Sequence, residues 1–189
     1  METVKKLLSM LPSNNISAIP MFEFAAIGKS ANGTADDIAS AIADADSIVE
    51  LSAGFGIASY TAIATIGGSA VGIVATNKTM DKLSSDDCAK IARFVRTCDA
   101  FTIPVLTIID TEGFDNDACV RDMAKLANAY AEATTLKISL VAGKAYGAAM
   151  AALGAGNADI TYAAAWALGN MYFILRHDSI NHSGIFASC

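Results

Sequence analysis

The residues with the clearest chemical potential lie in two short glycine-containing segments, Glu112–Phe114 and Lys144–Ala148. Each segment follows an apolar, β-branched run and precedes a helix-like pattern. Peptide NH groups at the start of a helix, here those of Gly147 and Ala148, lack intrahelical acceptors and can bind an anion. Two such donors and the helix dipole can hold a developing oxyanion without an acidic or basic side chain. A tight turn without function is the alternative that these residues leave open.

Other kinds of catalytic site are excluded by what the sequence lacks. The only histidines, His177 and His182, lie near the C-terminus, so a Ser/His or Cys/His nucleophile pair in the body has no base. Histidine-based metal sites fail for the same reason. The four cysteines form no CxxC pair, which argues against zinc. The lysine of Gly143–Gly147 is followed by no Ser or Thr, so this segment is not a phosphate-binding P-loop.

Composition predicts one well-packed domain. Of the 189 residues, 53% are hydrophobic and 17% are charged, which excludes disorder throughout the chain. The net charge of -6 and the absence of a basic cluster argue against a nucleic-acid partner. The longest uncharged run, 160–175, is shorter than the roughly 20 residues of a membrane span, and the N-terminus lacks a secretory signal. We therefore expect no membrane span and a cytoplasmic location with reduced cysteines.

The N-terminal third contains the signals of a linker and a hairpin. Residues 1–50 are interpreted as a linker segment with short helices, one ended by Pro12 and one at about 36–45 with Thr34 as N-cap. The run 62–75 consists of two β-prone halves around Gly67-Gly68. Because paired glycines permit the positive φ angles of a primed turn, this run predicts a β-hairpin.

The remainder alternates between helix and strand patterns. Helices are predicted at 84–98, 117–133 and 148–153, and buried strands at 101–109 and 136–142, the second strand being broken by 143–147. The segment 110–114 is interpreted as a loop in which the Asp110 carboxylate has a stabilising role. Strand, glycine loop and helix thus occur twice, which is typical of the crossover units of an α/β fold. Ligands of such sheets bind at the carboxyl ends of the strands, where both glycine segments lie.

Three blocks in this order, 94–114, 124–134 and 143–149, carry a family resemblance. The sequence from about 51 to 162 resembles the C-terminal half of the biotin-dependent acyl-CoA carboxyltransferases, the β-type subunits of propionyl-CoA and acetyl-CoA carboxylases and of sodium-pumping decarboxylases. Residues 6–15 are similar to the segment that joins the two halves of that family. The resemblance implies a crotonase-like ββα superhelix as a single domain at 51–175, after the linker and before a tail of unknown character at 176–189.

The resemblance also implies a function and a site. Gly147 and Ala148 match the family's backbone oxyanion hole for the ureido oxygen of biotin, with Lys144 and Tyr146 beside it, and Gly113 and Phe114 match a strand-end loop. The implied activity is transfer of a carboxyl group between carboxybiotin, on a biotin carrier protein, and an acyl-CoA such as acetyl- or propionyl-CoA, without a protein base. The implied partners are an N-terminal-half carboxyltransferase subunit or further copies of this chain.

Three departures from the family pattern keep other functions open. Ala148 replaces the second glycine of the oxyanion hole, the segment 114–124 is shortened, and the resemblance fades after Tyr162. A non-catalytic scaffold or truncated subunit of a biotin-dependent complex is one alternative. A crotonase-type hydratase or isomerase is another, which the absence of a Glu beside the helix-start glycine disfavours.

Overall fold

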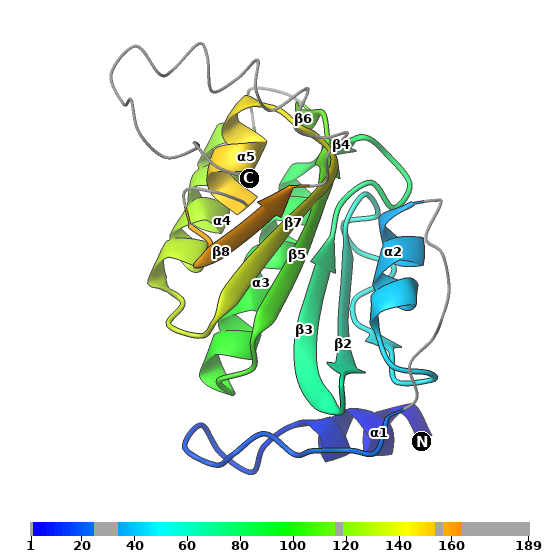
Figure 1. Ribbon diagram of the computed structural model, residues 1–189. Helices are drawn as coiled ribbons and strands as arrows, with labels where there is room; N and C mark the ends of the chain where they lie inside the picture. Colours follow the sequence, from blue (N-terminus) through cyan, green and yellow to red (C-terminus); the bar gives the residue numbers. More distant parts are fainter. Residues whose placement is uncertain (1, 25–33, 116–118, 154–156, 164–189) are drawn as a thin grey trace, which may run out of the picture.

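The computed structural model describes residues 2–24, 34–115, 119–153 and 157–163. Its strands are β1 (Val49–Glu50), β2 (Tyr60–Ile66), β3 (Ser69–Ala75), β4 (Lys82–Leu83), β5 (Val105–Thr111), β6 (Gly113–Phe114), β7 (Lys137–Ala145) and β8 (Ile160–Ala163). One sheet has the order β1-β2-β3-β5-β7-β8, and β4 pairs with β6 separately (Figure 1). The first three strands of this sheet are antiparallel, and β3, β5, β7 and β8 are parallel. The predicted α/β class is confirmed.

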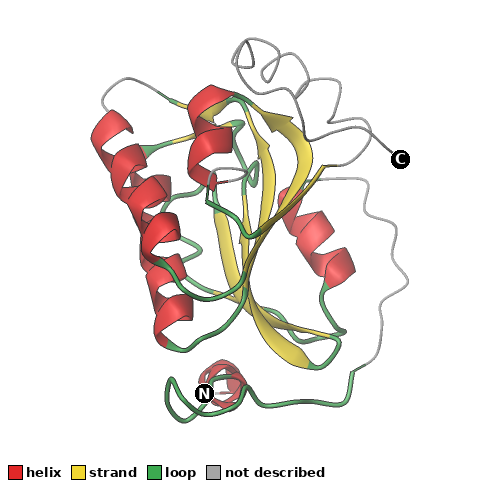
Figure 2. Cartoon of the chain, turned by 60° about the vertical axis from the view of Figure 1, so that its left-hand side comes forward, coloured by secondary structure: helices red, strands yellow, loops and turns green. Residues whose placement is uncertain are grey.

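Helices cover both faces of the sheet (Figure 2). They are α1 (Glu2–Met10), α2 (Ala35–Ile42), α3 (Ser85–Ala100), α4 (Val120–Glu132) and α5 (Gly147–Leu153). The main core, which includes Ile91, Leu126 and Tyr130, lies between the sheet and α3, α4 and α5. A smaller core that includes Ala39 and Ile73 lies under α2 on the opposite face. Because both faces are covered, the central strands are apolar along most of their length.

The predicted hairpin is confirmed, with its turn where the glycines indicate. β2 and β3 pair from Tyr60 with Ala75 to Ile66 with Ser69, and Gly67 and Gly68 have φ values of 59° and 79°. These left-handed values suit a primed turn. The NH groups of both glycines donate to the carboxylate of Asp44, at 3.0 and 2.8 Å. The turn is therefore also held by the segment that follows α2.

Helix α3 confirms the prediction at 84–98 and extends it slightly. Ser84 is the N-cap, and its side chain and that of Asp87 form a reciprocal capping box with each other's backbone NH groups. The predicted apolar face is buried; its members are Ile91, Phe94, Val95 and Cys98. The N-cap and the apolar spacing were sufficient to predict α3, because both signals lie within the helix itself.

Strand β5 differs from the expected 101–109. It begins at Val105, since its register is set by parallel pairing with β3 and β7, and Phe101 and Thr102 instead close the end of α3. The prediction of a loop at 110–114 is wrong in part. Asp110 and Thr111 belong to β5, and β6 pairs with β4, a contact between distant segments that no local pattern shows.

The end of β7 also differs from the prediction. The strand does not break after residue 142 but continues to Ala145, which pairs with Thr111 of β5. Only Tyr146 therefore separates β7 from α5. The helices expected at 36–45, 117–133 and 148–153 are present as α2, α4 and α5 with shifted ends. Residues 117 and 118 of the expected second helix lie outside the described ranges.

Parts of the predicted linker pack onto the sheet. Met10 and Val49 are buried in the main core, and Ala39 and Ala43 in the smaller one. The tail at 176–189 lies outside the described residues, so the predicted boundaries after residues 50 and 175 stay predictions. Within the described ranges, no helix is both long and apolar enough to cross a bilayer.

Asp99, at the end of α3, provides a pH-dependent contribution to stability. Partial burial acts to raise the pKa of its carboxyl, but hydrogen bonds from the NH groups of Thr135 and Thr134 outweigh burial, and the pKa is lowered. A lowered pKa stabilises the fold above the unfolded-state value of about 4, and this stabilisation is lost as pH falls through the folded pKa.

We expect Asp99→Asn, which keeps an acceptor oxygen but removes the charge, to lower the free energy of unfolding by about 1 kcal/mol at pH 7. The difference from the parent chain should shrink as the pH falls below about 4. Urea unfolding followed by circular dichroism at several pH values measures this difference. A difference that stays constant down to pH 3 contradicts the role of the Asp99 charge.

Candidate functional site

The predicted site residues meet at one edge of the sheet, beside the carboxyl ends of β5 and β7. Gly113 and Phe114 form β6, Lys144 is near the end of β7, and Gly147 and Ala148 begin α5. The last β5–β7 pair, Thr111 with Ala145, joins the two segments, and α5 packs against β6. Segments separated by thirty or so residues thus become neighbours, as the crossover topology predicts.

The start of α5 is accessible. Tyr146, Gly147 and Ala148 are exposed. Among the described residues, no heavy atom outside the chain neighbours and helix backbone of Gly147 lies within 4 Å of the position of a Cβ on this residue. The NH of Ala149 donates to the carbonyl of Tyr146 at 3.1 Å. The NH groups of Gly147 and Ala148 precede it at the helix start, where intrahelical acceptors do not exist. Two peptide donors therefore stand at an open surface.

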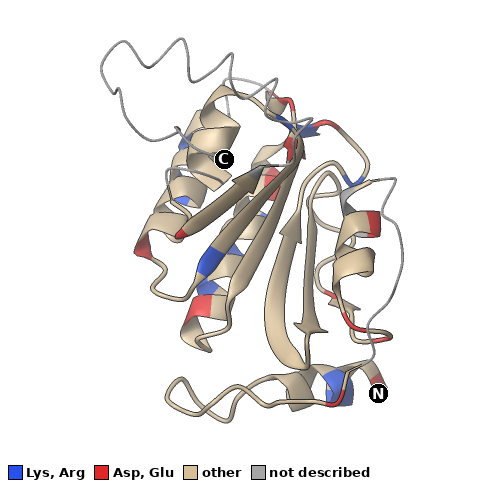
Figure 3. Ribbon diagram, viewed as in Figure 1, with Lys and Arg blue, Asp and Glu red and all other residues tan. Residues whose placement is uncertain are grey.

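Lys144 forms a small ion cluster beside these donors. Its Nζ lies 2.7 Å from Oε1 of Glu112 and 3.2 Å from Oδ2 of Asp81. Hydrogen bonding to Glu112 first, and to Asp81 second, raises the pKa of Lys144 above its usual value. Figure 3 shows charges of both signs at this end of the sheet, near β4 and β6. Asp81 could not be predicted as a site residue from the sequence, because only the fold brings its loop to β7.

Gly113 and Phe114 lie beneath the surface at this edge of the sheet, Gly113 buried and Phe114 partly buried. Gly113 is buried with φ at +120°, a value that L residues rarely adopt, and its NH donates to Oγ1 of Thr111 at 3.2 Å. Phe114 is half-buried and packs against the main core. The structure therefore places Phe114 as a core contact next to the site, and its role toward a ligand stays a prediction.

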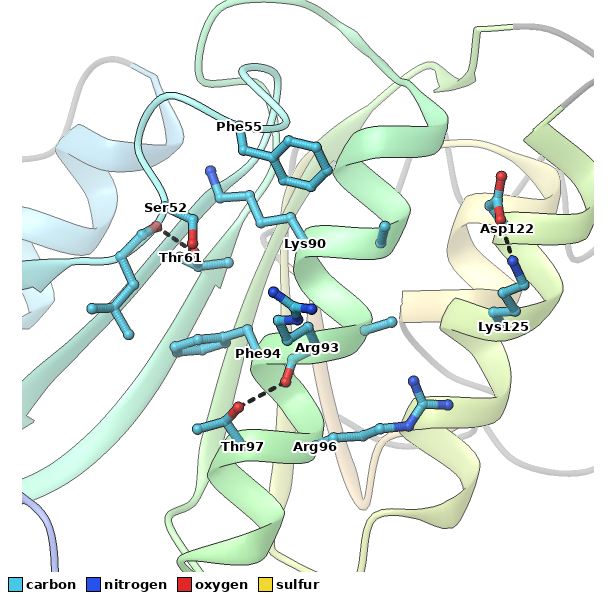
Figure 4. A pocket seen from close by; sticks show the side chains of 13 residues that line it. Ser52, Phe55, Thr61, Lys90, Arg93, Phe94, Arg96, Thr97, Asp122 and Lys125 are labelled. Carbon is cyan, nitrogen blue, oxygen red and sulfur yellow. Dashed lines mark hydrogen bonds and ion pairs between the residues drawn. The ribbon is translucent and has the colours of Figure 1, made fainter.

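Two of the hollows in the described part of the chain bear on the position of the site. One, of about 670 Å³, borders the ion cluster and is lined by Asp81, Glu112 and Met80 among others. The other, of about 580 Å³, lies over α3 and away from the predicted site, between Phe55, Arg93 and Lys125 (Figure 4). The first hollow is the one that adjoins the carboxyl edge of the sheet.

The backbone conformation of Gly147 limits which residues can replace it. Its φ of +50° lies in the left-handed region, which costs a residue with a Cβ about 1 to 2 kcal/mol. We expect Gly147→Ala to lower the free energy of unfolding by about 1 kcal/mol, and Gly147→Asn to lower it less, because Asn tolerates this region. Chemical denaturation of both variants tests this expectation. Equal stability of Gly147→Ala and the parent chain contradicts it.

Solved structures identify the class of fold. The chain is similar to a solved transcarboxylase 12S, described as a hexamer with hydrolysed methylmalonyl-CoA bound, at a TM-score of 0.77 and 31% identity over 86% of this chain and 37% of that one. The beta subunit of P. aeruginosa geranyl-CoA carboxylase has the same fold, at a TM-score of 0.63 and 21% identity over 97% of this chain and 40% of that one. The predicted crotonase-like carboxyltransferase fold is confirmed.

The sequence comparisons identify the family. The model of the carboxyl transferase domain matches residues 1–171, and the chain belongs to that family. It is 36% identical to the propionyl-CoA carboxylase beta chain of Saccharopolyspora erythraea, over 86% of this chain and 35% of the relative. It is 34% identical to the methylmalonyl-CoA decarboxylase subunit alpha of Propionigenium modestum, over 80% of this chain and 34% of the relative. The chain thus spans about a third of the length of these relatives.

Proposed function

We propose that this chain is the biotin-side component of a carboxyltransferase that moves a carboxyl group between carboxybiotin and an acyl-CoA. The observation that carries the proposal is the pair of exposed peptide groups, Gly147 and Ala148, at the carboxyl edge of the sheet. The relatives support the reaction class, since they are named as carboxylases, a decarboxylase and a carboxyltransferase of propionyl- or methylmalonyl-CoA. An acyl-CoA of this size is therefore the proposed substrate.

The residues at this edge fit a flat ligand with a carbonyl oxygen. No described residue fills the space in front of Gly147, and a carbonyl oxygen can accept from adjacent peptide donors at a helix start. Ala148 retains its NH although it adds a methyl group. Bound biotin supplies the chemistry of a carboxyl carrier. We assign the NH groups of Gly147 and Ala148 to hold its ureido oxygen, where negative charge develops, and Lys144 and Tyr146 to flank it.

We assign the other described residues at this edge to shaping and stabilising the site rather than to the reaction itself. The ion pairs with Glu112 and Asp81 fix the Lys144 side chain beside β6, and Gly113 and Phe114 hold the strand end. The buried thiols of Cys88 and Cys98 have pKa values raised by burial to about 12, so they are not nucleophiles near neutral pH. A reaction without a protein base suits such a site.

We further propose that the chain works in an assembly. The relatives are about three times longer, so an N-terminal-half carboxyltransferase subunit is the proposed partner for the acyl-CoA side, with a biotin carrier protein delivering carboxybiotin. Tyr146, Ile160 and Tyr162 are exposed apolar residues that a partner or a second copy can cover. A cytoplasmic location remains our expectation.

The proposed function is tested by reconstitution. The chain is mixed with the separately produced N-terminal half of the Saccharopolyspora relative, and free-biotin-dependent conversion of methylmalonyl-CoA to propionyl-CoA is followed by chromatography, with each half alone as the control. We expect conversion only when both halves and biotin are present. A complex that forms in light scattering but converts no thioester favours the scaffold function instead.

A further inference from the structure

The β5–β7 ladder contains an irregularity next to the proposed site. Ile109 pairs with Val141, but the next pair is Thr111 with Ala145. Between these two pairs β5 therefore contributes only Asp110, whereas β7 contributes residues 142–144. The extra residues form a bulge in β7, a feature that bends a strand and changes the direction in which the chain leaves it.

The side chain of Asp110 occupies the space at this bulge. Its Oδ1 accepts the NH of Lys144 at 2.8 Å, and its Oδ2 accepts from Nδ2 of Asn77 at 2.8 Å. A Cβ added to Gly143 would lie only 2.2 Å from Oδ1 of Asp110. The carboxylate therefore lies directly over Gly143 and holds the extra residues of the bulge in place.

The same carboxylate joins three strand ends. Asn77 follows β3, Asp110 lies in β5, and Lys144 lies in β7. The backbone NH of Asp110 is itself held by Oγ1 of Thr76 at 2.7 Å. Only Ala145 and Tyr146 separate Lys144 from Gly147, so the position of the helix start depends on where the bulge leaves β7.

We propose that Asp110 is a positioning residue that sets the peptide donors of Gly147 and Ala148 through the β7 bulge. The expected effect on biotin binding rests on the proposed function, whereas the effect of Asp110 on the position of the start of α5 does not. No ligand contact is assigned to Asp110 itself. Its effect is to fix the path of β7, because misplacement of binding groups by about 1 Å is sufficient for large losses of function.

A reciprocal exchange separates this role from general stability. In Asp110→Asn the amide oxygen can still accept the Lys144 NH, but the negative charge is lost, and Asn77 must turn its amide over to present its oxygen to the new NH2 group. Adding Asn77→Asp restores a hydrogen bond between an amide NH2 group and a charged carboxylate, with donor and acceptor exchanged. Asn77 has a φ of +62°, which Asp tolerates. Asn77→Gly, which also tolerates this φ, removes only the bond to Oδ2 and serves as a milder variant.

The experiment records amide NMR shifts of residues 144–148 in the full chain, first without ligand and then during titration with free biotin. We expect Asp110→Asn to change these shifts and to weaken biotin binding about tenfold. The double variant should restore the shifts and the biotin affinity of the parent chain. Asn77→Gly should change the shifts and the affinity in the same direction as Asp110→Asn, but less. Asp99→Asn is the matched control, because Asp99 also accepts backbone NH groups but lies elsewhere, and it should leave both unchanged.

Two results overturn the proposal. One is that Asp110→Asn lowers stability but leaves the shifts of 146–148 unchanged, and the other is that the double variant fails to restore them. Absence of biotin binding by the parent chain contradicts the proposed function instead. The ligand-free shifts then still decide whether Asp110 positions the helix start.

Discussion

Replacing Asp87 by alanine is expected to lower the free energy of unfolding by about 4 kcal/mol, the largest single loss that we foresee. Asp87 is 1% exposed and its carboxylate accepts four hydrogen bonds. Two come from the NH and Oγ of Ser59, at 2.8 and 2.9 Å, and two from the NH and Oγ of Ser84, at 2.9 and 2.6 Å. The variant leaves the buried NH of Ser59 without its acceptor and removes the capping interaction of the part-buried Ser84.

The neighbouring residue provides the control for Asp87. Asp86 lies in the same first turn of α3 but is exposed, so Asp86→Ala loses only its interaction with the helix dipole, about 0.5 kcal/mol. Guanidinium unfolding of both variants gives the comparison. Losses of similar size for Asp86→Ala and Asp87→Ala contradict the role of Asp87 as a buried anchor between α3 and the 52–59 loop.

Gly143→Ala is expected to lower the free energy of unfolding by about 3 kcal/mol. The new methyl group would lie 2.2 Å from Oδ1 and 2.3 Å from Cγ of Asp110, so the carboxylate or the strand must move. Gly54→Ala is the control, because no heavy atom of the described residues, apart from the chain neighbours, lies within 4 Å of a Cβ there. Its change should stay within about 0.5 kcal/mol.

A double-variant comparison isolates the cause of the Gly143 effect. If the Asp110 carboxylate is the obstacle, Gly143→Ala should be less harmful in a chain that already carries Asp110→Ala, and the two losses should not add. Thermal and chemical unfolding of the two single variants and the double variant measure this coupling. Additive losses contradict close packing of Asp110 on Gly143.

Elements with local signals could be predicted from the sequence. The Gly67-Gly68 pair specified the hairpin turn, and Ser84, Asp87 and the apolar spacing of 91–98 specified α3. The family resemblance predicted the fold, which the comparisons confirm. In each case the information lies within a few residues or in whole blocks of sequence.

The strand ends and the charge cluster could not be predicted in this way. β5 and β7 end where their pairing with each other places them, and the Asp110 carboxylate lies over Gly143 at the bulge. Lys144 meets Asp81 across 63 residues, so no spacing rule points to the pair. Glu112 is likewise distant in the sequence from Lys144, and only the fold brings their side chains to 2.7 Å from each other.

The most direct test of the central claim is calorimetric titration of free biotin into the purified chain and into Ala148→Pro and Ala148→Gly, with acetyl-CoA and propionyl-CoA titrated separately. Proline deletes one NH donor, whereas glycine keeps it. We predict saturable biotin binding by the parent chain and Ala148→Gly, weakened by at least about tenfold in Ala148→Pro. A folded parent chain that binds no biotin, or binds it equally well as Ala148→Pro, contradicts the assignment of these peptide groups to biotin.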